Sequence, residues 1–383
     1  MFGRKFELFT LFGFKVGIDA SWFILAILIT WSLATGYFPY AFEDLSTRTY
    51  WVMGVVGALG LFGSVVLHEF AHSWVARRNG LPMKGITLFI FGGVAEMSEE
   101  PPSPRVEFRV AVAGPIASIA IAAVAYATTV SGRLAGWPVP VVGVLSYLAM
   151  INLVLVAFNA VPAFPLDGGR VLRSFLWSWK DSLRWATRVT SKIGAIFGLV
   201  LIVLGVLSVL AGDFIGGMWW FLIGLFLRGA AQSSYQQLLM RQLLEGEPVR
   251  RFMNERPISV ERSLSVRQLV EEFVYRHHHK LFPVVEDDRI VGCVTTRDIK
   301  ELPRDEWERQ SVGAIAEECS DENTVGPDED AMKALARMTK SGNSRLMVVE
   351  DGRLIGILSL KDLLELFRHK IELEDLDETP EAA

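Results

Sequence analysis

Long apolar runs, each bounded by charged or turn-forming residues, make up most of the first 235 residues of the chain. A helix that crosses a bilayer needs about 20 mostly apolar residues, and six of the runs reach roughly that length. The pattern predicts a polytopic α-helical membrane domain with about six transmembrane helices. We expect these helices at residues 18–37, 50–77, 108–130, 141–162, 192–210 and 214–233.

Two shorter apolar segments, residues 6–12 and 87–94, are rich in β-forming side chains and are too short to cross a bilayer. Unpaired strand edges are not tolerated in contact with lipid. We therefore expect two short β-strands that lie at the cytoplasmic interface of the membrane domain or against its helix bundle.

The remainder of the chain contains an internal repeat. Residues 283–292 match residues 347–356 at an offset of 64, and each copy has the pattern strand, acidic turn, strand. An amphipathic helix precedes each copy, around residues 265–275 and 330–339. A period above about 60 residues is too long for a solenoid, so the repeat predicts a two-fold pseudo-symmetric α+β module.

The composition agrees with this division, since 51% of the residues are hydrophobic and only 21% are charged. Lysine and arginine exceed acidic residues by 17 to 12 up to residue 235, whereas acidic residues prevail by 31 to 21 beyond it. The net charge of -5 argues against nucleic-acid binding, and two cysteines exclude a disulfide-stapled secreted fold. The acidic tail at 371–383 is expected to be disordered.

Basic residues flank the expected helices unevenly. With the N-terminus in the cytoplasm, 14 lysines and arginines lie in inside segments, and only Arg48 and Arg133 lie in outside segments. Because cytoplasmic segments carry the excess of basic residues, the sequence predicts a multi-pass protein of the cell membrane with a cytoplasmic N-terminus. An even number of helices returns the charged second half of the chain to the cytoplasm as well.

His68, Glu69 and His72 form a metal-binding pattern inside the second apolar run. Positions i and i+4 share one face of a helix, so both imidazoles can reach one zinc ion. Glu69 is next in sequence and can hold a proton of a metal-activated water. Ionisable side chains inside a membrane helix are costly unless they are functional, which favours a metal site over a pair of packed histidines.

A catalytic zinc site takes three protein ligands, and no third histidine occurs before residue 277. The third ligand is therefore expected to be a carboxylate, and Asp167 is the leading candidate. It follows Pro162 and Pro165, which break the fourth apolar run, and the topology puts it at the membrane depth of the histidines. Otherwise, Asp167 would be an ordinary helix N-cap. The alternative ligands are Glu96, Glu99 and Glu100.

Four motifs carry a family resemblance: the 68–72 and 159–168 segments, Phe91-Gly92-Gly93 and Ala113-Gly114-Pro115. Through them, roughly residues 1–235 resemble the site-2 proteases, polytopic zinc metalloproteases that cut their substrates within the membrane. The resemblance implies that His68, His72 and Asp167 bind one zinc ion per chain and that Glu69 is the general base.

Two further roles follow from the same resemblance. It implies that Asn159 contacts the substrate backbone or the developing oxyanion. It also implies that the strand ending in Gly92 and Gly93 pairs with an unwound substrate, which suits the need for an extended backbone at the site.

The repeat resembles a tandem pair of cystathionine-β-synthase (CBS) domains across residues 248–370. The resemblance implies that a hydroxyl and a carboxylate in each copy hold an adenine nucleotide (ATP, ADP or AMP) as a regulator, and it favours a homodimer through the pair. In the alternative, the pair only folds and dimerises, and the same side chains are helix caps. These side chains are Thr295 and Asp298 in the first copy and Ser359 and Asp362 in the second.

The expected organisation is a membrane metalloprotease domain (1–235), a linker (236–247), two CBS domains (248–310 and 311–370) and the acidic tail. We expect an intramembrane zinc endopeptidase that cuts membrane-anchored proteins near the cytoplasmic leaflet (regulated intramembrane proteolysis) under control of the CBS pair. The alternatives are a transporter or channel gated by the CBS pair and an inactive scaffold that binds membrane partners.

Overall fold

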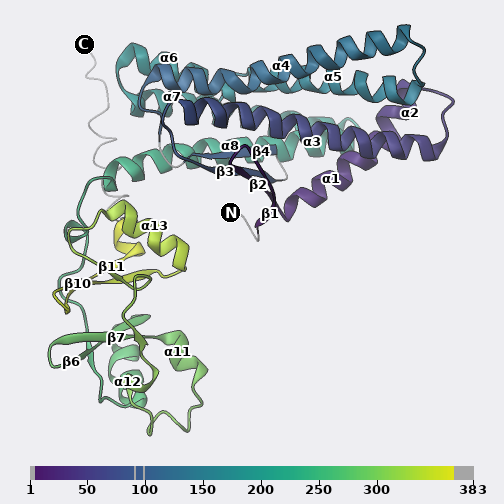
Figure 1. Cartoon of the computed structure of the whole chain (residues 1–383). Helices are drawn as coiled ribbons and strands as arrows, with labels where there is room; N and C mark the ends of the chain where they lie inside the picture. The colour runs from purple at the N-terminus through teal and green to yellow at the C-terminus, as the bar shows by residue number, and fades with distance from the viewer. Residues whose placement is uncertain (1–4, 90–91, 98–99, 366–383) are drawn as a thin grey trace. The chain divides into compact units, whose positions relative to one another are not determined.

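The computed structural model describes residues 5–89, 92–97 and 100–365, so the tail at 371–383 lies outside the described residues. The chain divides into two compact units, Met1–Gln236 and Gln237–Ala383. Long helices form most of the first unit, and short helices and strands form the second (Figure 1). Helix α8 (Phe214–Leu244) crosses the boundary, so the expected linker at 236–247 is largely helical. The helix continues because Leu243 and Leu244 are buried in the core of the second unit.

Five helical segments of the described chain are long and apolar enough to cross a membrane, which confirms a polytopic helical domain. The sixth expected span forms α8, a helix of 31 residues, and its passage through the bilayer stays a prediction. α6 (Asp167–Lys180) separates the fourth and fifth of these segments. The five are α1 (Ser21–Ser32) with a π-helical turn (Leu33–Tyr37) and α2 (Phe38–Ala41), then α3 (Thr47–Arg78), α4 (Pro104–Leu134), α5 (Val139–Asn159) and α7 (Leu183–Leu210).

Five of the six expected helix starts differ from the observed ones, and two of these differences have a clear local reason. α7 begins at Leu183 rather than at residue 192, because Ser182 caps the helix by accepting a hydrogen bond from the Trp185 backbone N–H. The first helix begins at Ser21 rather than at residue 18, because the preceding residues belong to strand β2 (Phe14–Asp19). Basic residues before residue 192 therefore lie on helix rather than in a loop.

The helices of the first unit expose large apolar side chains and pack through small ones. Ile27 is 69% exposed and Val124 is 67% exposed, as expected for surfaces that face lipid. Where α7 meets α8, a Cβ built on Gly205 would lie 2.6 Å from the Gly217 carbonyl oxygen, and the reverse distance is also 2.6 Å. Such close backbone approach is typical of membrane helix pairs. α4 packs against α3, α5 and α6, which places it between the elements that carry the candidate site.

A four-stranded sheet in the order β1-β2-β3-β4 accompanies these helices. β1 (Lys5–Leu11) and β2 form an antiparallel hairpin, β2 pairs in parallel with β3 (Met83–Phe89), and β3 pairs antiparallel with β4 (Gly92–Met97). The expected single strand at 87–94 is therefore two strands. Phe89 pairs with Gly92, so Gly92 and Gly93 begin β4 instead of ending β3. β3 is therefore hydrogen-bonded on both sides, by β2 and β4, and β4 is the edge strand of the sheet.

The second unit repeats one supersecondary pattern at the expected offset. The hairpin β6 (Leu281–Glu286) and β7 (Arg289–Thr295) has its counterpart in β10 (Arg345–Glu350) and β11 (Arg353–Ser359). Both turns contain two residues with positive φ, which suits tight hairpin turns. The other elements are a 3-10 turn (Val249–Arg251), β5 (Val260–Glu261), α9 (Val266–Gln268), a π-helical turn (Leu269–Val274), α10 (Tyr275–His277), α11 (Thr296–Glu301), α12 (Val312–Ile315), β8 (Glu317–Glu318), β9 (Thr324–Val325) and α13 (Ala331–Ser341).

Candidate metal centre

Helix α3 carries His68 and His72 on one buried face, with 6% and 4% of these residues exposed. Four residues correspond to about one helical turn, and the two Nε2 atoms lie 3.2 Å apart. The local spacing of the motif therefore directs two ring nitrogens to one point.

The other ring nitrogen of each histidine contacts helix α4. Nδ1 of His72 lies 2.6 Å from the Val110 carbonyl oxygen, and because a carbonyl only accepts, this nitrogen donates and leaves Nε2 with its lone pair. Nδ1 of His68 lies 2.9 Å from Ser118 Oγ. Partners of this kind fix the orientation of a metal-ligating imidazole. Neither partner was predicted, because contacts between helices leave no local signature in the sequence.

Asp167 reaches the histidines from α6. Helix α5 ends at Asn159, and after a short loop α6 begins at Asp167 itself, with Leu166 rather than Asp167 at the N-cap. Oδ2 of Asp167 lies 3.1 Å from His68 Nε2 and 3.2 Å from His72 Nε2. The loop folds tightly under α6, since a Cβ on Gly168 would overlap the Ala160 carbonyl oxygen. Asp167 thus faces the histidines instead of capping its own helix.

The donor set fits zinc. Ligand atoms of His68, His72 and Asp167 lie within 4.8 Å of one another, and no other such group occurs among the residues described. A tetrahedral zinc site with bonds of ~2.0–2.1 Å separates its ligand atoms by ~3.4 Å, close to the distances found here. Two imidazole nitrogens and one carboxylate are donor types that zinc takes in catalytic sites.

A cavity of about 550 Å³ opens beside the three side chains. Glu69, Asn159, Gly93 and Arg170 also line it. A Cβ on Gly93 would lie 2.6 Å from Glu69 Cγ, so the β4 backbone packs directly against the candidate base. Asn159 donates one amide hydrogen to the Leu155 carbonyl oxygen, 3.0 Å away. The structure thus brings the expected base, the expected polar contact and the edge strand to one cavity.

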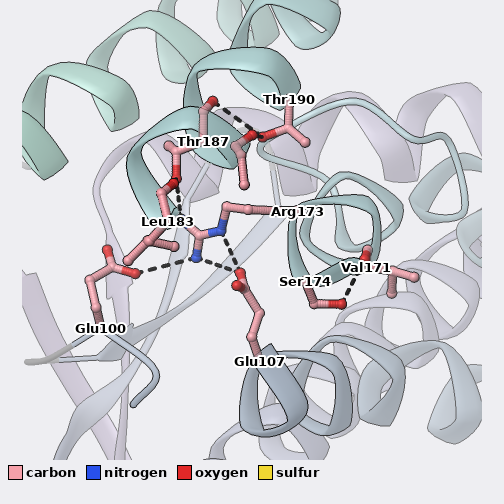
Figure 2. Close-up of polar contacts among 9 residues, drawn as sticks. Glu100, Glu107, Val171, Arg173, Ser174, Leu183, Thr187 and Thr190 are labelled. Carbon is pink, nitrogen blue, oxygen red and sulfur yellow. Dashed lines mark hydrogen bonds and ion pairs between the residues drawn. The ribbon is translucent and has the colours of Figure 1, made fainter. Parts of the chain in front are cut away.

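The alternative ligand Glu100 lies elsewhere, where its carboxylate pairs with Arg173 at 3.3 Å (Figure 2). Glu99 and the Glu96 side chain lie outside the described residues. Arg173 also binds Glu107, which is fully buried. Glu107 and Arg173 were not predicted to be functional, because both lie outside the expected spans at 108–130 and 141–162.

In the second unit, the four expected nucleotide contacts lie at strand-to-helix junctions. Thr295 and Asp298 form a capping box, with Asp298 Oδ2 accepting from the Thr295 backbone N–H at 2.7 Å and from its hydroxyl at 2.8 Å. Ser359 Oγ accepts from the Asp362 backbone N–H at 3.1 Å. These contacts fit the helix-cap alternative, and nucleotide binding stays a prediction.

Comparison with known proteins agrees with this geometry. A model of Peptidase family M50 matches residues 56–138 and 132–205, and a model of the CBS domain matches residues 249–305 and 314–369. Rip3 of Mycobacterium tuberculosis (strain H37Rv) is 35% identical over 357 residues, which are 92% of this chain and 90% of Rip3. The chain belongs to Peptidase family M50.

Another relative of this M50 peptidase, sll0528 of Synechocystis, is 32% identical over 93% of both chains. Among solved structures, the Site-2 Protease from Methanocaldococcus jannaschii is 27% identical, with a TM-score of 0.43 over 61% of this chain and 95% of that chain. The matches to the two family models confirm the expected resemblances to site-2 proteases and to a CBS pair. The protein is a zinc metalloprotease embedded in the membrane by several apolar helices.

Proposed function

We propose that this M50 peptidase is an intramembrane endopeptidase that hydrolyses peptide bonds of membrane-anchored proteins near the cytoplasmic leaflet. The observation that carries the proposal is the cluster of His68, His72 and Asp167 beside Glu69, at a cavity inside the helical unit. The cavity walls are mostly apolar and come from α1, α3, α5 and α8. Such a chamber suits a substrate segment drawn from a bilayer.

Three side chains would hold the metal, and Glu69 would move protons. Bound there, a zinc ion supplies Lewis-acid chemistry that polarises a peptide carbonyl and activates a water molecule at neutral pH. Glu69 takes a proton from the attacking water and passes it to the leaving amine nitrogen. Its position against Gly93 holds the carboxylate beside the ligands. His72 is kept in the required tautomer by Val110.

Substrate binding would use the edge of the sheet. Among the described strands, β4 pairs with β3 alone, and it begins with two glycines, which carry no side chain. An unwound substrate would add to this edge by backbone hydrogen bonds. Asn159 keeps a second amide hydrogen for the substrate backbone or the developing oxyanion, because only one is used by Leu155.

Two further parts of the proposal concern topology and control. The excess of basic residues between the expected spans supports a cytoplasmic N-terminus and a cytoplasmic CBS pair. We assign Thr295, Asp298, Ser359 and Asp362 to an adenine nucleotide that regulates the protease, with the pair also forming a homodimer. The equivalent location of both residue pairs in the two repeats supports this assignment.

Co-expression with a library of single-span membrane proteins tests the proposed function. The wild-type protease should cleave some of the library proteins, whereas the Glu69→Gln variant should cleave none. Substrates with glycine or proline near the cleavage site should be cut faster than versions with leucine there, because a helical backbone cannot lie along β4. Equal cleavage by both enzymes, or no dependence on helix-breaking residues, contradicts the proposal.

A further inference from the structure

Helix α4 contacts the candidate metal centre along one face. Glu107, Val110, Gly114 and Ser118 are spaced by three, four and four residues, which places them on one side of the helix. Val110 and Ser118 hold the two imidazoles. Gly114 lies so close to the rings that a Cβ there would overlap His72 Nε2. α4 therefore sets the position of the histidines, and Glu107 extends the same face by one turn.

Glu107 binds Arg173, which belongs to the helix that carries Asp167. The Arg173 guanidinium donates to Glu107 Oε1 at 2.5 Å, and the two residues are 4% and 0% exposed. The same guanidinium reaches Glu100 at 3.3 Å and Thr187 of α7 at 3.5 Å (Figure 2). One side chain thus ties α6 to α4, to α7 and to the segment that follows β4.

Arg173 also touches the loop that leads into Asp167. Its guanidinium carbon lies 5.1 Å from the centre of the Phe164 ring, within cation–π distance. The start of α6 is therefore held at two points, by the Phe164 loop before Asp167 and by the Glu107 pair after it. The Asp167 side chain contacts the two histidines, so its position depends on how α6 is held.

We propose that Arg173 is a positioning residue for the zinc ligand Asp167, and that its buried ion pair with Glu107 fixes α6 against the histidine-holding helix α4. An arginine suits this task, because its planar fork meets several acceptors in fixed directions. An ion pair of this burial is weak support for stability alone, since two apolar residues would often stabilise a fold as well. Here the ion pair would serve to fix the orientation of α6 relative to α4. The inference rests on the ligand set of the proposed function.

Zinc affinity of the full-length protein tests this, measured by competition with a chromophoric chelator. Arg173→Met should weaken zinc binding by about 10- to 100-fold, the usual effect of losing a residue that supports a metal ligand. Arg173→Lys should fall between this variant and wild type. Arg109→Met is the matched control, since Arg109 is an exposed arginine on α4, and its zinc affinity should equal that of wild type.

A double variant separates positioning from mere stability. Arg173→Met with Glu107→Leu removes both buried charges, and the remaining partner carboxylate, Glu100, is 36% exposed and can be solvated. Weak zinc binding at an unchanged melting temperature of the zinc-free protein supports the proposal, and wild-type zinc affinity overturns it. Should the neutral variants not fold, Arg173→Lys decides, because wild-type affinity there also overturns it. Zinc retained in Asp167→Ala would instead refute the ligand set itself.

Discussion

Gly114→Ala tests the location of the metal centre without changing any of the candidate ligands. Gly114 lies inside α4, where alanine is normally favoured over glycine by about 1 kcal/mol. Here the added Cβ would lie 2.5 Å from His68 Nε2 and closer still to His72 Nε2. Since a relaxed contact needs about 3.5 Å, the rings must move by about 1 Å.

A shift of that size exceeds what a zinc site tolerates. Metal–ligand distances are held within about 0.2 Å, so a displacement of about 1 Å in both imidazoles should break at least one bond. We expect zinc affinity to fall at least about 100-fold, which corresponds to about 2.7 kcal/mol. The zinc-free protein should stay folded and melt slightly below the wild-type temperature, because displacing two buried rings costs about 1–3 kcal/mol and the alanine returns only about 1 kcal/mol.

The assay is zinc content after dialysis against graded chelator, together with thermal unfolding followed by circular dichroism. Gly63→Ala is the matched control, because Gly63 lies in α3 and a Cβ there meets no described atom within 4 Å. That variant should keep zinc. Wild-type zinc affinity in Gly114→Ala would refute the location of the metal between α3, α4 and α6.

Three further outcomes are expected. Gly93→Ala puts a Cβ 2.6 Å from Glu69 Cγ and should slow cleavage about 100-fold without changing zinc content; slow cleavage with lost zinc would contradict this. Adenine nucleotide should shift protease activity by about 5- to 150-fold, and Asp298→Ala with Asp362→Ala should remove the effect. If calorimetry detects no binding at millimolar nucleotide, the CBS pair has only a structural role. Slight burial raises the pKa of Asp330, but backbone N–H donors, including that of Gly246, lower it overall. Its contribution to stability is thus complete above pH ~4 and is lost as the pH falls through the folded pKa. Asp330→Ala should therefore cost about 1 kcal/mol at neutral pH and less at lower pH in denaturant unfolding, and an equal cost at both pH values would contradict this.

Structural features that follow from a short stretch of sequence could be predicted from the sequence alone. The spacing of His68 and His72 determined a shared helix face, and the two prolines before Asp167 marked the break that lets α6 begin there. The repeat at offset 64 gave both hairpins of the second unit. These features depend on residues close together in the chain, so periodicity and turn chemistry sufficed.

Features that depend on contacts between distant segments were missed. Residues 87–94 have one continuous β-forming pattern, and only the pairing of Phe89 with Gly92 shows that they form two strands. α8 extends to Leu244 because that leucine completes the core of the second unit. Glu107 and Arg173 are 66 residues apart, and no local signal links them. Gly114 belongs to an expected motif, but its close approach to the imidazoles results from the packing of α4 against α3, which no local pattern reveals.

Purified protein in liposomes with a cleavable single-span substrate provides the most direct test of the central claim, with zinc content measured on the same samples. Wild-type protein should hold one zinc per chain and cleave the substrate. Glu69→Gln should hold the same zinc and cleave at least about 100-fold more slowly, because it loses the proton acceptor but none of the metal ligands. Cleavage by Glu69→Gln at the wild-type rate would contradict the account.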